Sequence, residues 1–238
     1  MPKKFLQAGW RNLLMANYVT DASLLKQYVP AGTELDDFNG RYYISLVGFL
    51  FMDTKVLGVG FPFHRTFEEV NLRFYVKYKE QTQWKRGVVF VKEIVPLRLI
   101  SLIANRLYGE KYVSLPMRHY WMERANNTIA VEYYWRVNNN WNYLKAIAGK
   151  EPIVYTEGSE ENFITEHYWG YTCRRNNGTS EYQVTHPQWR IHPVHSYDIH
   201  CSIAELYGKE FEATLQQPPR SVFLAEGSEI CVMRGKRI

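Results

Sequence analysis

A short stretch of alternating polar and apolar residues carries the side chains best suited to chemistry. Its polar members, within residues 67–76, are Glu69, Asn71, Arg73 and Tyr75. Because the side chains of a β-strand alternate between its two faces, this spacing predicts one strand with a carboxylate, an amide, a guanidinium and a phenol in a row. A guanidinium in such a row can hold a carboxylate or a phosphate. The alternative interpretation is a hydrogen-bonded strand face that only fixes the register of a sheet.

Three further side chains, with Glu69, are the candidates for catalysis. His64 lies in a loop before this strand, where a histidine acts as a general acid or base or is simply exposed to solvent. Lys92 and Lys111 are the candidate amines. A lysine that faces a protein interior is a nucleophile because its pKa falls, whereas a lysine at a sheet edge only discourages aggregation.

The histidines of the C-terminal third do not indicate a metal site. His186, His192, His195 and His200 match no zinc-binding spacing, and two of them precede proline. Structural or surface roles explain them better. We therefore predict no metal and no other cofactor.

Composition predicts one β-rich domain. The chain has 238 residues, of which 46% are hydrophobic and 22% charged, as in an ordinary globular protein. The aromatic share of 16%, with 18 Tyr and 7 Trp, favours many short strands over a helical bundle. The economical interpretation is a single domain over residues 1–238, mostly β with a few helices.

Net charge and cysteine content limit the classes of partner and the cellular compartment that we expect. The formal charge is +5, but the basic residues are dispersed, so we expect no nucleic-acid binding. No apolar run approaches the length of a membrane span, so no membrane is expected. Three widely spaced cysteines without a C-x-x-C pair suit reduced thiols in the cytoplasm. The predicted partner is a small-molecule ligand, and the oligomeric state stays open, a homo-oligomer included.

The neighbouring segments predict how the polar row is held. Residues 42–52 are apolar at both parities, which indicates a central strand buried on both faces, preceded by an Asn39-Gly40 turn. Residues 87–95 are rich in valine and predict an antiparallel partner for the row. Residues 97–107 have apolar side chains at helical spacing. We also expect a short helical run at 143–148 and a C-terminal hairpin around residues 226–228.

Several of these stretches together resemble the YqjF-like family of domains of unknown function, in the acetoacetate-decarboxylase-like superfamily. The resemblance spans nearly the whole chain, and its most specific part is the run of residues 69–73. The other matching positions are Trp10, Met15, Tyr18, Asp21, Leu24, Leu25, Val29, Pro30, Ser45 to Phe49, Tyr75, Val76, Arg86, Gly87, Val88, Tyr108 and Gly109.

The resemblance implies an antiparallel, cone-like β-barrel with peripheral helices and an enclosed cavity. Acetoacetate decarboxylase forms a Schiff base through a lysine whose pKa is lowered by an adjacent lysine. In this chain the only adjacent lysines are Lys3 and Lys4, at the N-terminus. Lys92 and Lys111 each stand alone downstream of Glu69, so the resemblance does not carry over the lysine pair.

Two functions follow from the resemblance. The first is a cavity that binds a small polar or anionic metabolite without Schiff-base chemistry. Its lining would be Glu69, Asn71 and Arg73 with the aromatic residues Tyr75, Tyr42 and Tyr108. The second is a decarboxylase-like enzyme acting on a carbonyl or β-keto acid substrate, with Lys92 or Lys111 as the amine and Glu69 as acid or base.

Overall fold

The computed structural model describes residues 3–60, 65–108, 111–174 and 178–238. The helices within these ranges are short, and none is long and apolar enough to cross a membrane. In chain order the elements are β1 (Lys4–Thr20), α1 (Ala22–Lys26), β2 (Thr33–Leu35), β3 (Tyr42–Val56), β4 (Phe67–Glu80), β5 (Gln83–Val95), α2 (Arg98–Tyr108), β6 (Tyr112–Ser114), β7 (Met117–Arg124), β8 (Thr128–Val137), β9 (Asn140–Gly149), α3 (Glu160–Thr165), β10 (Trp169–Cys173), β11 (Thr179–Thr185), β12 (Ile191–His200), α4 (Ile203–Leu206), the 3-10 turn η1 (Lys209–Phe211), α5 (Glu212–Leu215), β13 (Ser221–Met233) and β14 (Lys236–Arg237).

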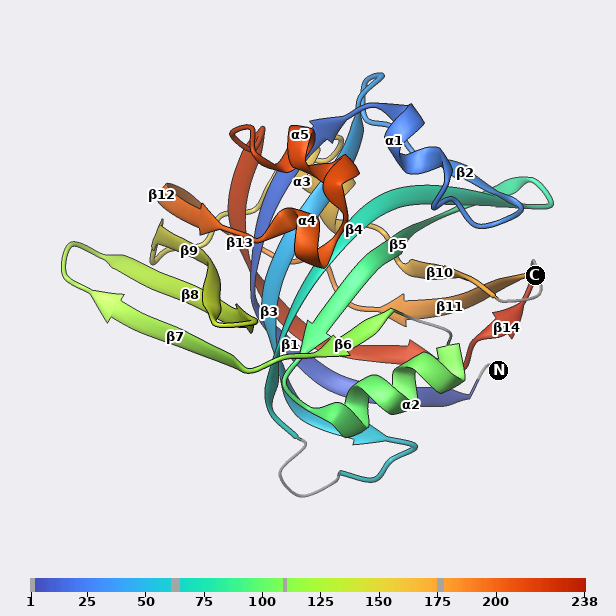
Figure 1. Ribbon diagram of the computed structural model, residues 1–238, viewed down its shortest axis with the longest axis horizontal. Helices are drawn as coiled ribbons and strands as arrows, with labels where there is room; N and C mark the ends of the chain where they lie inside the picture. The colour runs from blue at the N-terminus through green and yellow to red at the C-terminus, as the bar shows by residue number, and fades with distance from the viewer. Residues whose placement is uncertain (1–2, 61–64, 109–110, 175–177) are drawn as a thin grey trace.

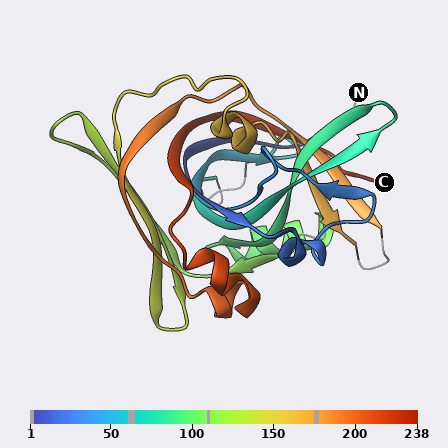
Figure 2. The ribbon, with the colours of Figure 1, turned by 90° about the horizontal axis from the view of Figure 1, so that it is seen from above.

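Strands from both ends of the chain close into a ring. Its neighbours, in order, are β13, β1, β3, β4, β5, β10 and β11, and β11 pairs again with β13 where Val184 faces Val232. The pairing of β5 with β10 is parallel and the other pairings around the ring are antiparallel. Figure 2 shows the curled sheet from above. Closure of the ring turns one face of each strand toward a common interior.

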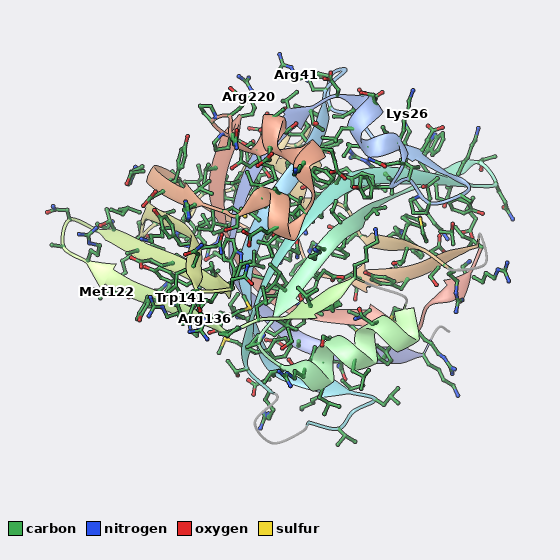
Figure 3. The ribbon with its side chains drawn as sticks, viewed as in Figure 1. Lys26, Arg41, Met122, Arg136, Trp141 and Arg220 are labelled. Atoms are coloured by element: carbon green, nitrogen blue, oxygen red, sulfur yellow. The ribbon has the colours of Figure 1, made fainter. Side chains whose placement is uncertain are left out.

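Four strands form an arm outside the ring. β12 pairs with β13, and β9, β8 and β7 follow in that order, so that β7 is an outer edge strand (Figure 1). Met122, Arg136 and Trp141 lie on the side of the arm that faces solvent (Figure 3). The arm covers the ring rather than extending its interior.

The two faces of the ring strands bury different apolar clusters. Met15 and Val47 pack in the cluster inside the ring. Their chain neighbours Leu14 and Leu46 pack outside the ring, in a cluster that includes Trp135 of the arm. This double coverage explains why residues 42–52 are apolar at both parities, as predicted for a central strand.

Several predicted elements are confirmed. β3 lies between β1 and β4, and β5 is the antiparallel partner of β4. Asn39 and Gly40 both have positive φ, 53° and 76°, as the predicted turn requires. The mostly β fold class with few helices is also confirmed.

The predicted helix at 143–148 is wrong, because these residues belong to β9. They pair with β8 in a continuous antiparallel register that runs from Asn140 opposite Val137 to Gly149 opposite Thr128. Leu144 and Ala146 are buried between more exposed neighbours, which is the alternation of a strand. Pairing across the sheet overrides the local preference for helix.

The predicted C-terminal hairpin is also wrong, because residues 221–233 form one strand. β13 pairs with β1 from Ser221 opposite Asn17 to Met233 opposite Lys4. Gly227 has a φ of 80°, and a Cβ there would lie 2.0 Å from the Trp10 carbonyl oxygen. This glycine therefore permits a close approach of two strands rather than a turn.

Candidate functional site

The interior of the ring holds a cavity of about 140 Å³. Its wall is mainly aromatic and aliphatic, and the polar side chains gather on β4 and on the segments next to it. Its polar and aromatic lining residues include Trp10, Thr54, Glu69, Asn71, Arg73, Glu93, Tyr112, His167, Tyr182 and His186. Such a largely apolar space with a few polar groups in its wall is typical of a ligand site.

One end of the polar wall is an acidic, hydrogen-bonded group. Asn71 Nδ2 donates to Glu69 Oε1 at 2.9 Å, and the Tyr112 hydroxyl donates to Glu69 Oε2 at 3.0 Å. Glu93 stands opposite Asn71 on β5. Burial, together with the charges of Glu69 and Glu93, raises the pKa of Tyr112 well above its usual value. The phenol therefore stays protonated and remains a hydrogen-bond donor.

Arg73 is a buried cation next to this group. Its side chain forms no ion pair with any carboxylate of the described residues, and its Nη2 contacts Met15 Sδ at 3.8 Å. The Nε atom is buried and has no hydrogen-bond partner in the described part of the chain. An unpaired buried charge is costly, so the position favours an anion supplied by a ligand.

The other end of the wall is a histidine held by an aspartate. His167 Nε2 lies 3.1 Å from Asp36 Oδ2, and Arg86 Nε donates to the same oxygen at 2.6 Å. Burial of Asp36 opposes its ionisation, but the hydrogen bonds from His167 and Arg86 outweigh this and lower its pKa. Asp36 is therefore a carboxylate, which only accepts hydrogen bonds.

The state of His167 follows from these partners. Burial lowers the pKa of His167 to about 4, and the charges of Arg86 and Arg73 act in the same direction, against the effect of Asp36. The ring is thus neutral at pH 7. Because Nε2 must donate to Asp36, the proton resides there and Nδ1 is an unprotonated acceptor. That Nδ1 is buried and has no partner within the described ranges.

The structure brings only part of the predicted ligand row to the cavity. Glu69, Asn71 and Arg73 line it. Tyr75 belongs to the same row but bonds to Ser45 Oγ at 2.7 Å and lies behind the wall, against His167.

The remaining predicted residues either lie away from the cavity or are not among the described residues. Tyr42 is on the opposite face of β3, packed against the outer cluster. His64 lies outside the described residues, as does the side chain of Tyr108, the last residue of α2.

Both candidate lysines lie outside the ring. Burial and the nearby charge of Lys111 lower the pKa of Lys92, yet its amine donates to the carbonyl oxygen of Leu206 in α4. Lys111 Nζ lies 5.2 Å from the centre of the Tyr28 ring. Neither amine reaches the cavity.

A bulge explains the position of Lys92. The pairing of β4 with β5 shifts register, so that Arg73 faces Phe90 whereas Leu72 faces Lys92. Phe90 and Glu93 both line the cavity, and the extra residue between them turns Lys92 outward. A strict period of two along β5 would have placed Lys92 inside with Phe90.

Asp36 and His167 were absent from the sequence-based candidates. They are 131 residues apart, and no motif links them. The only signal was local. Ser159 is the N-cap of α3 and its side chain accepts a hydrogen bond from the Asn162 backbone N–H, and the helix ends two residues before His167. Only the docking of α3 into the ring places the histidine.

Comparison with known proteins identifies relatives along the chain. A family model described as an uncharacterised conserved protein, DUF2071, matches residues 7–229. The chain is 29% identical over 190 residues to the uncharacterised protein YqjF of Bacillus subtilis, which covers 78% of this chain and 74% of YqjF. The predicted family is thereby confirmed.

Solved structures share the fold. Acetoacetate decarboxylase from Legionella pneumophila superposes with a TM-score of 0.66 at 14% identity, covering 100% of this chain and 88% of that one. An acetoacetate decarboxylase-like enzyme from Sphingomonas wittichii RW1 gives a TM-score of 0.67 at 11% identity, covering 99% and 94%. The enduracididine biosynthesis enzyme MppR, in complex with pyruvate, gives 0.66 at 9%, covering 100% and 91%. At such identities the likeness shows the fold alone.

Proposed function

The chain belongs to the DUF2071 family of uncharacterised conserved proteins, and from this premise we propose that its ring cavity binds a small organic carboxylate without forming a Schiff base. The observation that carries the proposal is Arg73, a buried guanidinium at the cavity wall with no carboxylate partner in the described chain. A bound carboxylate would compensate its charge and pair with it through two hydrogen bonds.

The volume of the cavity suits a small ligand. Its volume of about 140 Å³ is close to the roughly 150 Å³ of an engineered cavity that takes up benzene. A ligand of about six or seven non-hydrogen atoms therefore fits. Pyruvate, which binds to the structural relative MppR, is of this size, and it supports a small carboxylate here.

Catalysis on a carbonyl or β-keto acid through a lysine is the second candidate. The lowered pKa of Lys92, with Lys111 nearby, favours it, and some structural relatives are decarboxylases. Against it, the Lys92 amine bonds to Leu206 outside the ring. Borohydride reduction in the presence of acetoacetate, followed by mass spectrometry, should leave every lysine unmodified, and an adduct on Lys92 or Lys111 would establish the enzyme instead.

The carboxylate site is tested by calorimetric titration with pyruvate and with propionate. We expect Arg73→Met to weaken binding of both about tenfold or more, because a charge-assisted hydrogen bond contributes about 1.5–3 kcal/mol. The matched control is Arg190→Met, which removes an exposed arginine paired with Glu226. Equal affinities of wild type and Arg73→Met would refute the site.

The fold of the test variant is checked separately. Since Arg73 has no acidic partner in the described residues, its replacement by an apolar side chain should leave the urea midpoint unchanged or raise it. Lost binding with an intact midpoint is then attributable to the site.

A further inference from the structure

Residues that line the cavity carry buried polar atoms without a partner in the described chain, and these atoms call for a ligand with two kinds of hydrogen-bonding group. Arg73 Nε and Trp10 Nε1 are donors, Asn71 Oδ1 and His167 Nδ1 are acceptors, and the Thr54 hydroxyl can act as either. The orientation of Asn71 is fixed because its Nδ2 donates to Glu69, whose carboxylate oxygen accepts. A carboxylate accepts hydrogen bonds from the donors but can donate none to the two acceptors.

His167 Nδ1 is the better defined of the two acceptors. Its tautomer is set by Asp36, and the ring is held in place by Tyr75 and Phe163, whose ring centres lie 4.7 and 5.0 Å away. Only 7% of the residue is exposed. Such a preorganised acceptor should discriminate between ligands that can donate a hydrogen bond and those that cannot.

The surrounding charges decide which donor suits it. Asp36 occupies the Nε2 side of the ring, where Arg86 and Lys77 compensate it. Arg73 and Arg86 act on His167 as positive charges and Asp36 acts as a negative charge. A cationic ammonium at Nδ1 would add one more buried charge whose desolvation is costly, whereas a neutral hydroxyl would not.

We propose that the cavity is selective for a small hydroxy acid, with its carboxylate on Arg73 and its hydroxyl donating to His167 Nδ1. The proposal rests on the carboxylate function proposed above and adds the second recognition point. Lactate and 3-hydroxybutyrate have the size that the cavity admits. His167 is then a specificity-determining residue.

The proposal is tested first on the wild-type protein with matched probes. Lactate should bind about tenfold more tightly than propionate, and 3-hydroxybutyrate more tightly than butyrate, because each pair differs only by the donated hydroxyl. Pyruvate and alanine should bind no better than propionate, since one lacks a donor and the other carries a cationic one. Nitrogen-15 NMR provides a second readout: the Nδ1 resonance of His167 should shift with lactate and not with propionate.

Two variants then locate the acceptor. His167→Phe keeps an aromatic ring in the pocket but removes Nδ1, and we expect the lactate to propionate affinity ratio to fall to about one while propionate binds as before. The matched control is His186→Phe at the same cavity, where the histidine stacks on Trp189 with ring centres 4.0 Å apart. This control should retain the wild-type ratio.

The outcomes separate the two proposals. If propionate binds in an Arg73-dependent manner but lactate binds no more tightly, the carboxylate site stands and the hydroxy-acid inference is overturned. A ratio lost in His186→Phe but kept in His167→Phe also overturns it. If no probe binds in an Arg73-dependent manner, both proposals fall together.

Discussion

At the scale of single residues, the cavity wall contains charges and polar atoms that burial makes costly. Arg73 has no acidic partner in the described chain. His167 is kept neutral by burial, although it bonds to Asp36, which also accepts a hydrogen bond from Arg86. Groups of this kind lower the stability of the folded protein, and they are retained where a function needs them. Their titration should therefore be visible in the stability of the protein.

Stability should fall when the pH is lowered from 7 toward 4. The unfolded chain protonates His167 near pH 6.5, whereas the folded chain resists protonation until about pH 4. Between these values the unfolded state binds more protons, so the free energy of unfolding decreases as the pH falls. Protonation of His167 in the unfolded chain lowers the free energy of unfolding by about 3 kcal/mol over this window, at roughly 1.4 kcal/mol per pH unit.

Urea unfolding at pH 7.5, 6.5, 5.5 and 4.0 measures this loss. In His167→Phe the loss between pH 6.5 and 4 should be smaller than in wild type by about that amount. The lowered pKa of Asp36 acts in the same direction at lower pH, and it remains in the variant because Arg86 still bonds to Asp36. Identical pH profiles for the two proteins would contradict the buried, neutral state of His167.

At the scale of elements, the ring depends on one short parallel contact. β5 and β10 pair only through Trp169 opposite Gly87 and Gly170 opposite Val88. A Cβ at Gly87 would lie 2.5 Å from the Trp169 carbonyl oxygen and 2.6 Å from Tyr171 Cε2. The backbones of the two strands meet so closely that no larger residue fits without moving one of them.

Gly87→Ala should therefore destabilise the protein by about 1–3 kcal/mol, the usual cost of overpacking. Gly149→Ala in β9 is the matched control, since the nearest atom to its Cβ would be His195 Nε2 at 3.4 Å. Urea midpoints of both variants measure the difference. Equal midpoints would contradict this prediction, because they would show that the contact between β5 and β10 accommodates the added methyl group without loss of stability.

At the scale of the whole molecule, β13 joins parts of the structure that are distant in sequence. It pairs with β1 and β11 in the ring and with β12 at the base of the arm. β14, in contrast, pairs with β11 at only two positions. The single domain predicted from the sequence would make the ring and the arm one cooperative unit.

Two truncations test this proposal. A chain that ends at Met233 lacks β14 and should unfold in one urea transition, seen equally by tryptophan fluorescence and far-ultraviolet circular dichroism. A chain that ends at Pro219 lacks β13 and should not fold at all. Separate transitions for fluorescence and circular dichroism, or a folded chain without β13, would contradict the single cooperative domain.

Local sequence was sufficient for the features that depend on nearest neighbours. Alternation with a period of two predicted β4 and its polar row, and apolar residues at both parities predicted the central position of β3. Asn39-Gly40 predicted its turn, because positive φ is a property of the residues themselves. The residue run of β4 also pointed to the family, which the comparisons confirm.

Tertiary structure decided which side chains share the cavity. A bulge in β5 moves Lys92 to the outer face, and pairing with β8 makes a strand of residues predicted to be helical. Asp36 and His167 meet across 131 residues because α3 packs into a ring that closes only when β11 reaches β13. Such contacts depend on the register and packing of distant strands, which no local pattern encodes, whereas the row of Glu69, Asn71 and Arg73 was already determined by the alternation of a single strand.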